Sequence, residues 1–238
     1  MTLDAISIAS TVTAIHSASM RTGIDFNYLL AEAKAESGLD AGAVSATSSA
    51  RGLYQFTRGT WLETVRKHGA EHGLAWAANA VADGRAAHDP VTRTAILDLR
   101  RDPAASASMA AAYAVDNAAK LAASLGRPAT GTDLYLAHFL GAAGALHFLK
   151  ARAAGPDTAA ATVAPTAARS NHSVFFTVNG TPRSLSAVYD HFAAKFGQPV
   201  PSTGTDLPPA RSFPALQVAA WAPDAARTAY LLLAELSA

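Results

Sequence analysis

Cysteine is absent from the 238 residues of the chain. The absence excludes disulfides, thiol nucleophiles and Cys-ligated zinc, and it leaves the redox compartment open. An excess of one charge is also missing, because 19 Lys and Arg face 18 Asp and Glu. With this near balance and no basic stripe along the chain, no nucleic-acid partner is expected.

Long apolar runs are lacking as well. The longest candidate, residues 229–236, contains Glu235 and is far shorter than the roughly 20 apolar residues that cross a bilayer. We therefore expect no membrane span. The N-terminus has no basic segment followed by an apolar run, so it does not predict a secretory signal peptide.

What the chain does have is alanine and clear helix boundaries. Hydrophobic residues make up 50% of the sequence, and many of them are alanines, which favour helix over strand. The fold class is therefore predicted to be all-α. Asp25 is a good N-cap and Gly38 a good stop for one helix, while Asp89-Pro90 and Asp102-Pro103 each place a cap directly before a first-turn proline. The expected helices span about residues 4–20, 26–37, 103–125, 132–140, 142–152 and 185–196, with shorter ones starting at Thr60, as a capping box with Glu63, and at Pro90.

The C-terminal third has a different composition. Residues 155–171 are rich in Ala, Thr and Pro without a clean period, which predicts a linker or an extended surface segment. Residues 173–178, followed by Asn179-Gly180, predict a short strand and a turn. The helix over residues 185–196 has an aromatic face that we expect to pack on the preceding domain, and a Pro-rich loop over residues 199–209 leads to a last helical region that Pro223 divides.

One acidic side chain stands out on the helix that Asp25 begins. Leu29 and Glu36 are seven residues apart, so both lie on one helix face, and Glu36 falls in the last turn before Gly38. The negative end of the helix dipole and apolar surroundings would both raise the pKa of this carboxyl, as a general acid requires. The alternative is a solvated charge at a helix end. Glu32, one turn earlier, is expected to face solvent.

The stretch from Glu36 to Phe56 carries the most specific pattern. Ser37 follows the glutamate directly, Ser45 stands nine residues after it, and Gly-Leu-Tyr-Gln occupies residues 52–55. With this spacing the chain resembles the soluble lytic transglycosylase family, which is related to goose-type lysozymes, over about residues 24–152. Ser49-Ala50 departs mildly from the Gly-Ala that the family commonly has before its Gly-Leu pair.

The resemblance implies roles for several of these residues. Gly52 would let the backbone approach a sugar closely, and Tyr54 would present its ring to that sugar. The Gln55 amide offers a donor and acceptors for an N-acetyl or hydroxyl group. Ser45 and Gln55 would position the N-acetyl group or the Glu36 carboxyl.

A later family motif, Tyr-Asn-Ala-Gly, is more altered. Its best counterpart is residues 138–141, His-Phe-Leu-Gly, so that the family's tyrosine over the catalytic glutamate maps to His138. Variants of this kind resemble flagellar and phage-associated lytic enzymes. His138 would hold or polarise Glu36, or Tyr135, three residues earlier, would supply the phenol instead. A satisfied core histidine is the alternative.

A metal site is not expected. His68 and His72 are four residues apart, but Gly69 ends the expected helix between them, and no third ligand is near. Asp40, the nearest second acid to Glu36, lies in a glycine-flanked loop with no evident reason to face a cleft. The family's chemistry needs neither a metal nor a cofactor.

The resemblance implies a lysozyme-like catalytic domain over residues 1–153, with a linker and a mostly helical extension over residues 154–238. Glu36 would cleave the bond between N-acetylmuramic acid and N-acetylglucosamine and leave a 1,6-anhydro end. A hydrolytic muramidase of the same fold and a catalytically inactive peptidoglycan-binding or scaffold module are the alternatives. The expected partner is peptidoglycan outside the cytoplasmic membrane, with a flagellar or secretion apparatus as a possible second partner.

Overall fold

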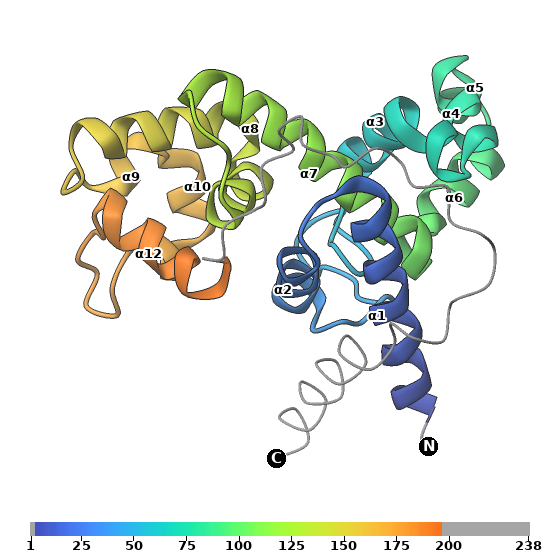
Figure 1. Cartoon of the computed structure of the whole chain (residues 1–238), viewed down its shortest axis with the longest axis horizontal. Coiled ribbons are helices and arrows are strands. Elements are labelled where there is room, and N and C mark those ends of the chain that lie inside the picture. Colours follow the sequence, from blue (N-terminus) through green and yellow to red (C-terminus); the bar gives the residue numbers. More distant parts are fainter. Residues whose placement is uncertain (1–2, 197–238) are drawn as a thin grey trace, which may run out of the picture. The chain divides into compact units, whose positions relative to one another are not determined.

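The computed structural model describes residues 3–196, and every regular element in that range is a helix (Figure 1). Four isolated β-bridges are the only ladder pairings in the described range, and two of them, Val44 with Arg51 and Arg51 with Phe56, shape the loop after α2. The all-α prediction is confirmed. The helices are α1 Leu3–Thr22, α2 Phe26–Ser37, α3 Arg58–His68, η1 Gly69–His72, α4 Ala75–Ala82, α5 Arg85–His88, α6 Pro90–Asp98, η2 Leu99–Arg101, α7 Pro103–Leu125, α8 Gly131–Ala154, α9 Ala160–Val163, α10 Pro165–Ser170, α11 His172–Phe175 and α12 Leu185–Phe196.

The helix boundaries that have a capping residue follow the sequence closely. The Asp25 carboxylate accepts from the Tyr28 N–H at 2.9 Å and begins α2, and Gly38 ends it in the left-handed conformation. Asp102 accepts from the Ala105 N–H at 2.7 Å and begins α7. These contacts satisfy amide groups that the first turn of a helix cannot pair internally.

The predicted start of α3 is wrong, because the N-cap lies about one turn earlier than expected. Thr57, not Thr60, is the N-cap, and its hydroxyl accepts from the Thr60 N–H at 3.3 Å. Glu63 does not close a capping box, because its carboxylate pairs with Arg66 at 2.6 Å. The predicted end of this helix at Gly69 is confirmed.

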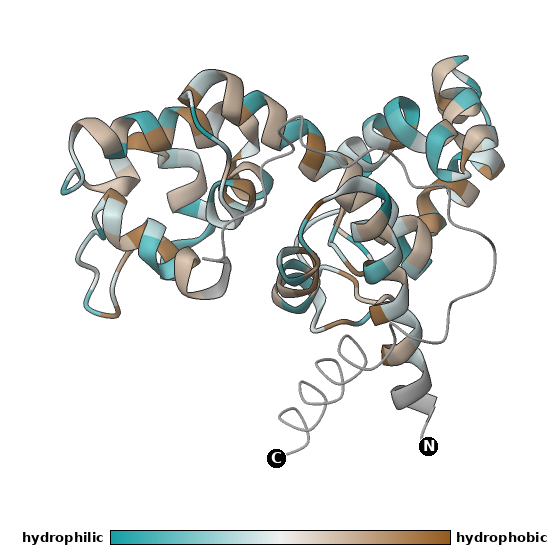
Figure 2. Ribbon diagram, viewed as in Figure 1, coloured by the Kyte–Doolittle hydropathy of each residue, from teal (hydrophilic) through white to brown (hydrophobic). Residues whose placement is uncertain are grey.

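Alanine lets α7 lie at the centre of the core. Buried α7 residues include Ala107, Met109 and Ala111, and α1, α3 and α8 all pack against this helix. Because alanine side chains are short, neighbouring helices approach α7 closely on several sides. Figure 2 shows apolar and polar residues mixed along the helices rather than gathered in separate segments. In the described range no helix is long and apolar enough to cross a membrane.

The linker predicted over residues 155–171 is wrong. The short helices α9 and α10 occupy most of it, with Ala160 and Ala168 buried, and the Ala160 N–H donates to the Arg183 carbonyl at 2.9 Å. Figure 1 shows α9, α10 and α12 gathered beside α8. The lack of a helical period in this stretch reflects helices of only a few residues, each too short to show one.

The predicted strand over residues 173–178 is also wrong, since α11 takes its first half. The turn at Asn179-Gly180 is present, with Gly180 at φ 78°. A single bridge between Phe176 and Pro182 closes it. The Pro-rich loop over residues 199–209 and the helical region around Pro223 lie outside the described residues.

The last described helix supports α8 through aromatic contacts. On α12, Val188 and Phe192 are buried, and α12 packs against both α8 and α2. The Phe192 ring lies 5.1 Å from the Tyr135 ring in an edge-to-face arrangement and 5.3 Å from the Phe139 ring. The described part of the C-terminal third thus braces the helix that carries Tyr135.

Candidate functional site

Glu36 lies at the edge of the core, as the helix-face argument predicts. Leu29, on the same face of α2, is fully buried, whereas the Glu36 side chain is 20% exposed. Ser37, the next residue, ties this end of α2 to the following loop, because its hydroxyl donates to the Leu53 carbonyl at 2.8 Å. The carboxyl of Glu36 is therefore held at a defined place while remaining open to solvent.

Two side chains of α8 meet this carboxyl on the same oxygen atom. The Tyr135 hydroxyl donates to Oε1 of Glu36 at 3.1 Å, and Nε2 of His138 lies 3.6 Å from that oxygen. Their rings are nearly parallel, with centroids 6.0 Å apart. Both candidates for the family's tyrosine therefore contact Glu36, and Tyr135 is the one that supplies a phenol.

Burial and then the neighbouring Glu36 raise the pKa of Tyr135 well above its ordinary value. The phenol consequently stays protonated over the physiological range and acts as a hydrogen-bond donor. A donor fixed on one carboxyl oxygen also fixes the rotation of that carboxyl.

The expectation that Glu32 faces solvent is wrong. Its side chain is only 4% exposed, and its Oε1 lies 2.9 Å from Nδ1 of His138. The reason is that His138 of α8 contacts Glu32 and that α12 packs against α2, and residues four apart on a helix share a face. Sequence reasoning missed Glu32 even though its spacing from Glu36 places both carboxyls toward one partner.

His138 therefore lies between two acids. Burial by itself lowers the pKa of His138, but the charge of Glu32, a hydrogen bond to Glu32 and the charge of Glu36 outweigh burial and raise this pKa to about 9. The neighbourhood extends to Tyr28, where burial and then the charge and hydrogen bonding of Glu32 raise the pKa of the phenol. If His138 were only a core histidine with its hydrogen bonds satisfied, the Glu32 contact would be explained. The position of the ring beside Glu36 would not.

The loop between α2 and α3 carries the other predicted site residues. Ser45 accepts hydrogen bonds from the amides of Thr47 and Ser48 at 3.3 and 3.2 Å. The Gln55 amide nitrogen donates to the carbonyls of Gly52 at 2.9 Å and Ala43 at 3.3 Å. Both side chains thus hold the loop in shape, and Gln55 does so at a positive φ of 45°.

Two predicted sugar contacts are corrected by the structure. Tyr54 is fully buried, and its hydroxyl donates to the Leu29 carbonyl at 3.1 Å, so its ring packs in the core and faces no cleft. Gly52 is needed for a protein contact, because a Cβ there would lie 1.7 Å from the Arg100 carbonyl oxygen. The positive φ of 80° at Gly52 is a second reason for glycine.

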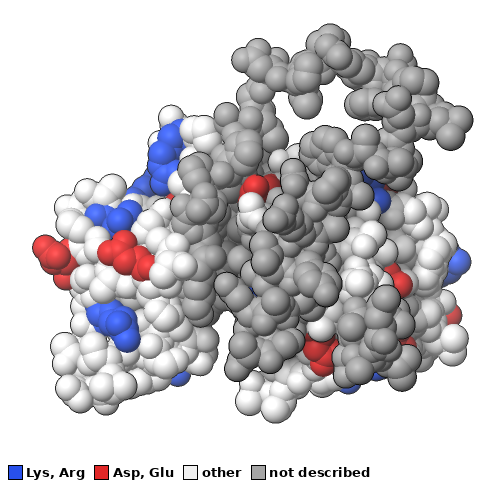
Figure 3. Space-filling model, turned by 60° about the horizontal axis from the view of Figure 1, so that its bottom comes forward, with Lys and Arg blue, Asp and Glu red and all other residues white. Residues whose placement is uncertain are grey.

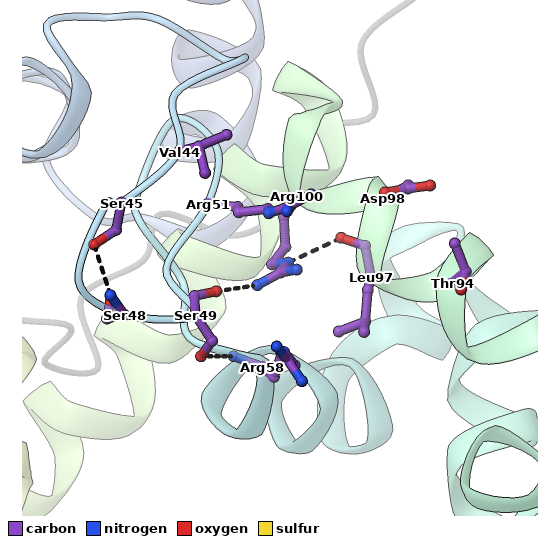
Figure 4. A pocket seen from close by; sticks show the side chains of 10 residues that line it. All are labelled: Val44, Ser45, Ser48, Ser49, Arg51, Arg58, Thr94, Leu97, Asp98 and Arg100. Carbon is purple, nitrogen blue, oxygen red and sulfur yellow. Dashed lines mark hydrogen bonds between the residues drawn. The ribbon is translucent and has the colours of Figure 1, made fainter. Parts of the chain in front are cut away.

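Arg100 anchors the same loop and was missed by the sequence analysis. Its guanidinium donates to the carbonyls of Ser49 at 2.7 Å and Leu97 at 2.8 Å (Figure 4). It also donates to the carbonyl of Phe56 at 3.1 Å. Burial, followed by the charges of nearby Arg51 and Arg58, lowers the pKa of Arg100. No sequence signal marks it, because its partners are main-chain carbonyls, and two of them, those of Ser49 and Phe56, are far away along the chain.

Figure 4 shows the pocket that these arginines line together with Ser45, with a volume of about 290 Å³. Glu36 is not among its lining residues. The pocket therefore lies on the α6 side of the loop, and the Glu36 carboxyl does not line it.

The remaining charged groups are spread out. On the face that Figure 3 displays, basic and acidic side chains are interspersed over the described surface. His68 pairs with Asp116 at 2.9 Å and not with His72. The described residues hold no group of three or more His, Cys, Asp or Glu that would bind a metal ion.

A comparison with protein families covers α2 and the loop that follows it, which form the first half of this site. A family model described as the transglycosylase SLT domain matches residues 13–131, which is half of the chain. The matched range includes Glu36 and the whole loop up to Phe56, and it ends before Tyr135 and His138. From this match over α2, its loop and α7, the chain belongs to the transglycosylase SLT domain family.

Proposed function

We propose that this protein cleaves the glycan strands of bacterial peptidoglycan as a lytic transglycosylase, with Glu36 as general acid and then general base. Membership of the SLT family supports a lytic transglycosylase-type function on peptidoglycan. The assignment of Glu36 as the acid and base rests on its partly exposed carboxyl, whose Oε1 accepts a hydrogen bond from Tyr135. Because peptidoglycan lies outside the cytoplasmic membrane, we place the activity there.

In the proposed reaction Glu36 protonates the glycosidic oxygen between N-acetylmuramic acid and N-acetylglucosamine. The C1–O bond breaks, the N-acetylglucosamine side leaves as the alcohol, and an oxocarbenium-like centre forms at C1. The C6 hydroxyl of the muramyl residue then attacks C1 and gives its proton back to the Glu36 carboxylate. The cycle forms one 1,6-anhydro ring, consumes no water and restores the acid.

The neighbouring acids favour this reaction over hydrolysis. A muramidase needs a second carboxylate that orients water or attacks the sugar. Glu32 is buried and paired with His138, and Asp40 accepts from the Gly42 N–H at 2.7 Å within its own turn. Neither acid presents a carboxylate beside Glu36 for that purpose, which supports intramolecular attack by the C6 hydroxyl.

The test is the Glu36→Gln variant on purified sacculi, with Glu63→Gln as the matched control on the exposed face of α3. We expect Glu36→Gln to lower muropeptide release by about 10²- to 10⁴-fold, the range of general acid catalysis, and to leave the helical circular dichroism unchanged. Mass spectrometry of the wild-type digest should show anhydro-muropeptides.

Three results would contradict the proposal. Full activity of Glu36→Gln would remove this residue from the mechanism. Reducing ends in place of anhydro ends would favour the muramidase. Binding of wild-type protein to sacculi without any cleavage would favour the inactive module.

A further inference from the structure

We propose that Glu32 is a positioning residue, which holds His138 as an imidazolium against Glu36 and thereby stabilises the negative charge that Glu36 acquires when it gives up its proton. The inference rests on the proposed function of Glu36 and adds a role that the mechanism above does not use. It concerns three side chains, Glu32 and Glu36 from α2 and His138 from α8, which are called the acid–histidine–acid cluster below.

The geometry of the cluster favours a doubly protonated ring when both carboxyls are ionised. Nδ1 of His138 lies 2.9 Å from Oε1 of Glu32, and Nε2 lies 3.6 Å from Oε1 of Glu36. A neutral imidazole has one N–H and one lone pair, so it would point a lone pair at one of these carboxyl groups. Only the imidazolium directs an N–H to each of them.

The charges balance best in the transition state. While Glu36 carries its proton, Glu32 and His138 form a neutral ion pair. When that proton moves to the glycosidic oxygen, the new negative charge forms 3.6 Å from the imidazolium and next to the Tyr135 hydroxyl. Donors that are already in place for a developing charge lower the barrier without any rearrangement.

Burial explains why Glu32 is needed. An imidazolium with an 18% exposed side chain has lost most of its hydration, and a nearby carboxylate compensates for that loss. A buried ion pair contributes little net stability by itself, so its position beside a reacting carboxyl points to function. The high pKa of His138, about 9, agrees with this arrangement.

Other ionisable groups near α8 do not replace Glu32. On α12, Tyr189 faces Asp133 at 3.2 Å, Asp190 is exposed and the His191 ring contacts Phe192. On α7, Asp116 is paired with Lys67 at 2.6 Å. Of the described residues, Glu32 and Glu36 are the two whose charges raise the pKa of His138.

The experiment compares wild type with Glu32→Gln, which keeps a hydrogen-bond acceptor for Nδ1 but removes the charge. His138 is titrated by NMR of the labelled ring, and muropeptide release is measured from pH 5 to about pH 10. Since the raised pKa keeps His138 charged below about pH 9, the NMR titration of the wild type should show the imidazolium throughout the range in which Glu36 can hold its proton. In Glu32→Gln we expect the His138 titration to move down by about one pH unit or more, and the maximal rate to drop about tenfold.

His138→Gln and the double variant make the test independent of the behaviour of any single variant. His138→Gln should slow the reaction as Glu32→Gln does, and adding Glu32→Gln to it should cost no further activity, because both changes remove the same ion pair. Glu63→Gln, on the exposed surface, should leave the pH profile unchanged. An unmoved His138 titration in Glu32→Gln, or additive losses in the double variant, would overturn the inference.

The outcomes separate this inference from the proposed function. Wild-type protein without activity on sacculi would overturn the function of Glu36, while the NMR titration would still test the pairing of Glu32 with His138. If Glu32→Gln does not fold, the wild-type titration decides, since a His138 pKa near the ordinary 6.5 would contradict the cluster.

Discussion

The two halves of the site are held by different kinds of contact. The loop between α2 and α3 is fixed by main-chain carbonyls that accept from Ser37, Gln55 and Arg100. The α8 half is fixed by side chains alone, through the contacts of Tyr135 and His138 with acids on α2. The first half lies within the family match, whereas the residues of the second lie beyond it.

The two kinds of contact place different demands on the sequence. A loop held by main-chain groups needs particular residues at particular spacings, so its motif can be recognised in the sequence. A helix face that presents a donor to a carboxyl can use either a phenol or an imidazolium, provided that the partner acids are matched. In our proposal Glu32 is such a matched partner, and it would let a histidine take the place that the resemblance assigns to the family's tyrosine.

The largest effect should come from the loop half, in Gly52→Ala. The added Cβ would overlap the Arg100 carbonyl at 1.7 Å, and alanine is strained at a φ of 80°, so we expect a loss of about 3 kcal/mol or more in the free energy of unfolding. Chemical denaturation measures it. The control is Gly59→Ala, where nothing lies within 4 Å and the change should be neutral or slightly stabilising. Equal stability of the two variants would show that the loop does not depend on this close approach.

A smaller effect, on rate rather than stability, should come from the α8 half in Tyr135→Phe. Loss of the hydroxyl that donates to Glu36 should slow muropeptide release by about tenfold to a hundredfold, because that donor stabilises the carboxylate formed in the reaction. Tyr113→Phe, on α7, is the matched control. If Tyr135→Phe keeps the wild-type rate, His138 alone serves as the donor in this half.

The smallest effect should come from Tyr54→Phe, which returns to the loop half. Its hydroxyl donates to the Leu29 carbonyl inside the core, so we expect a loss of about 1 kcal/mol in stability and no change in muropeptide release. Melting curves and the sacculus assay measure the two. Slower release at unchanged stability would restore Tyr54 as a sugar contact.

The sequence alone predicted the parts that depend on local interactions. Asp25 and Gly38 delimit α2 correctly because capping acts within a few residues. The place of Glu36 at the core edge follows from helical spacing to Leu29. The burial of Glu32 could not be predicted, since it depends on tertiary contacts of α2 with His138 of α8 and with α12.

The same reasoning explains the other errors. Gly52 was correctly singled out, but the group it approaches is the Arg100 carbonyl, which the distant helix η2 supplies. Residues 155–171 lack a period because their helices are only a few residues long, and tertiary contacts rather than propensity order them.

The break in α8 at Gly141, where φ is 73° and ψ is 157°, has an electrical consequence for the histidine before it. The aligned peptide dipoles of residues 131–140 terminate at this break, so their negative pole lies within one turn of His138. In an unbroken helix that pole would lie at Ala154. The main chain itself therefore favours a positive ring at this position by about 0.3–1 kcal/mol, in addition to the carboxylates.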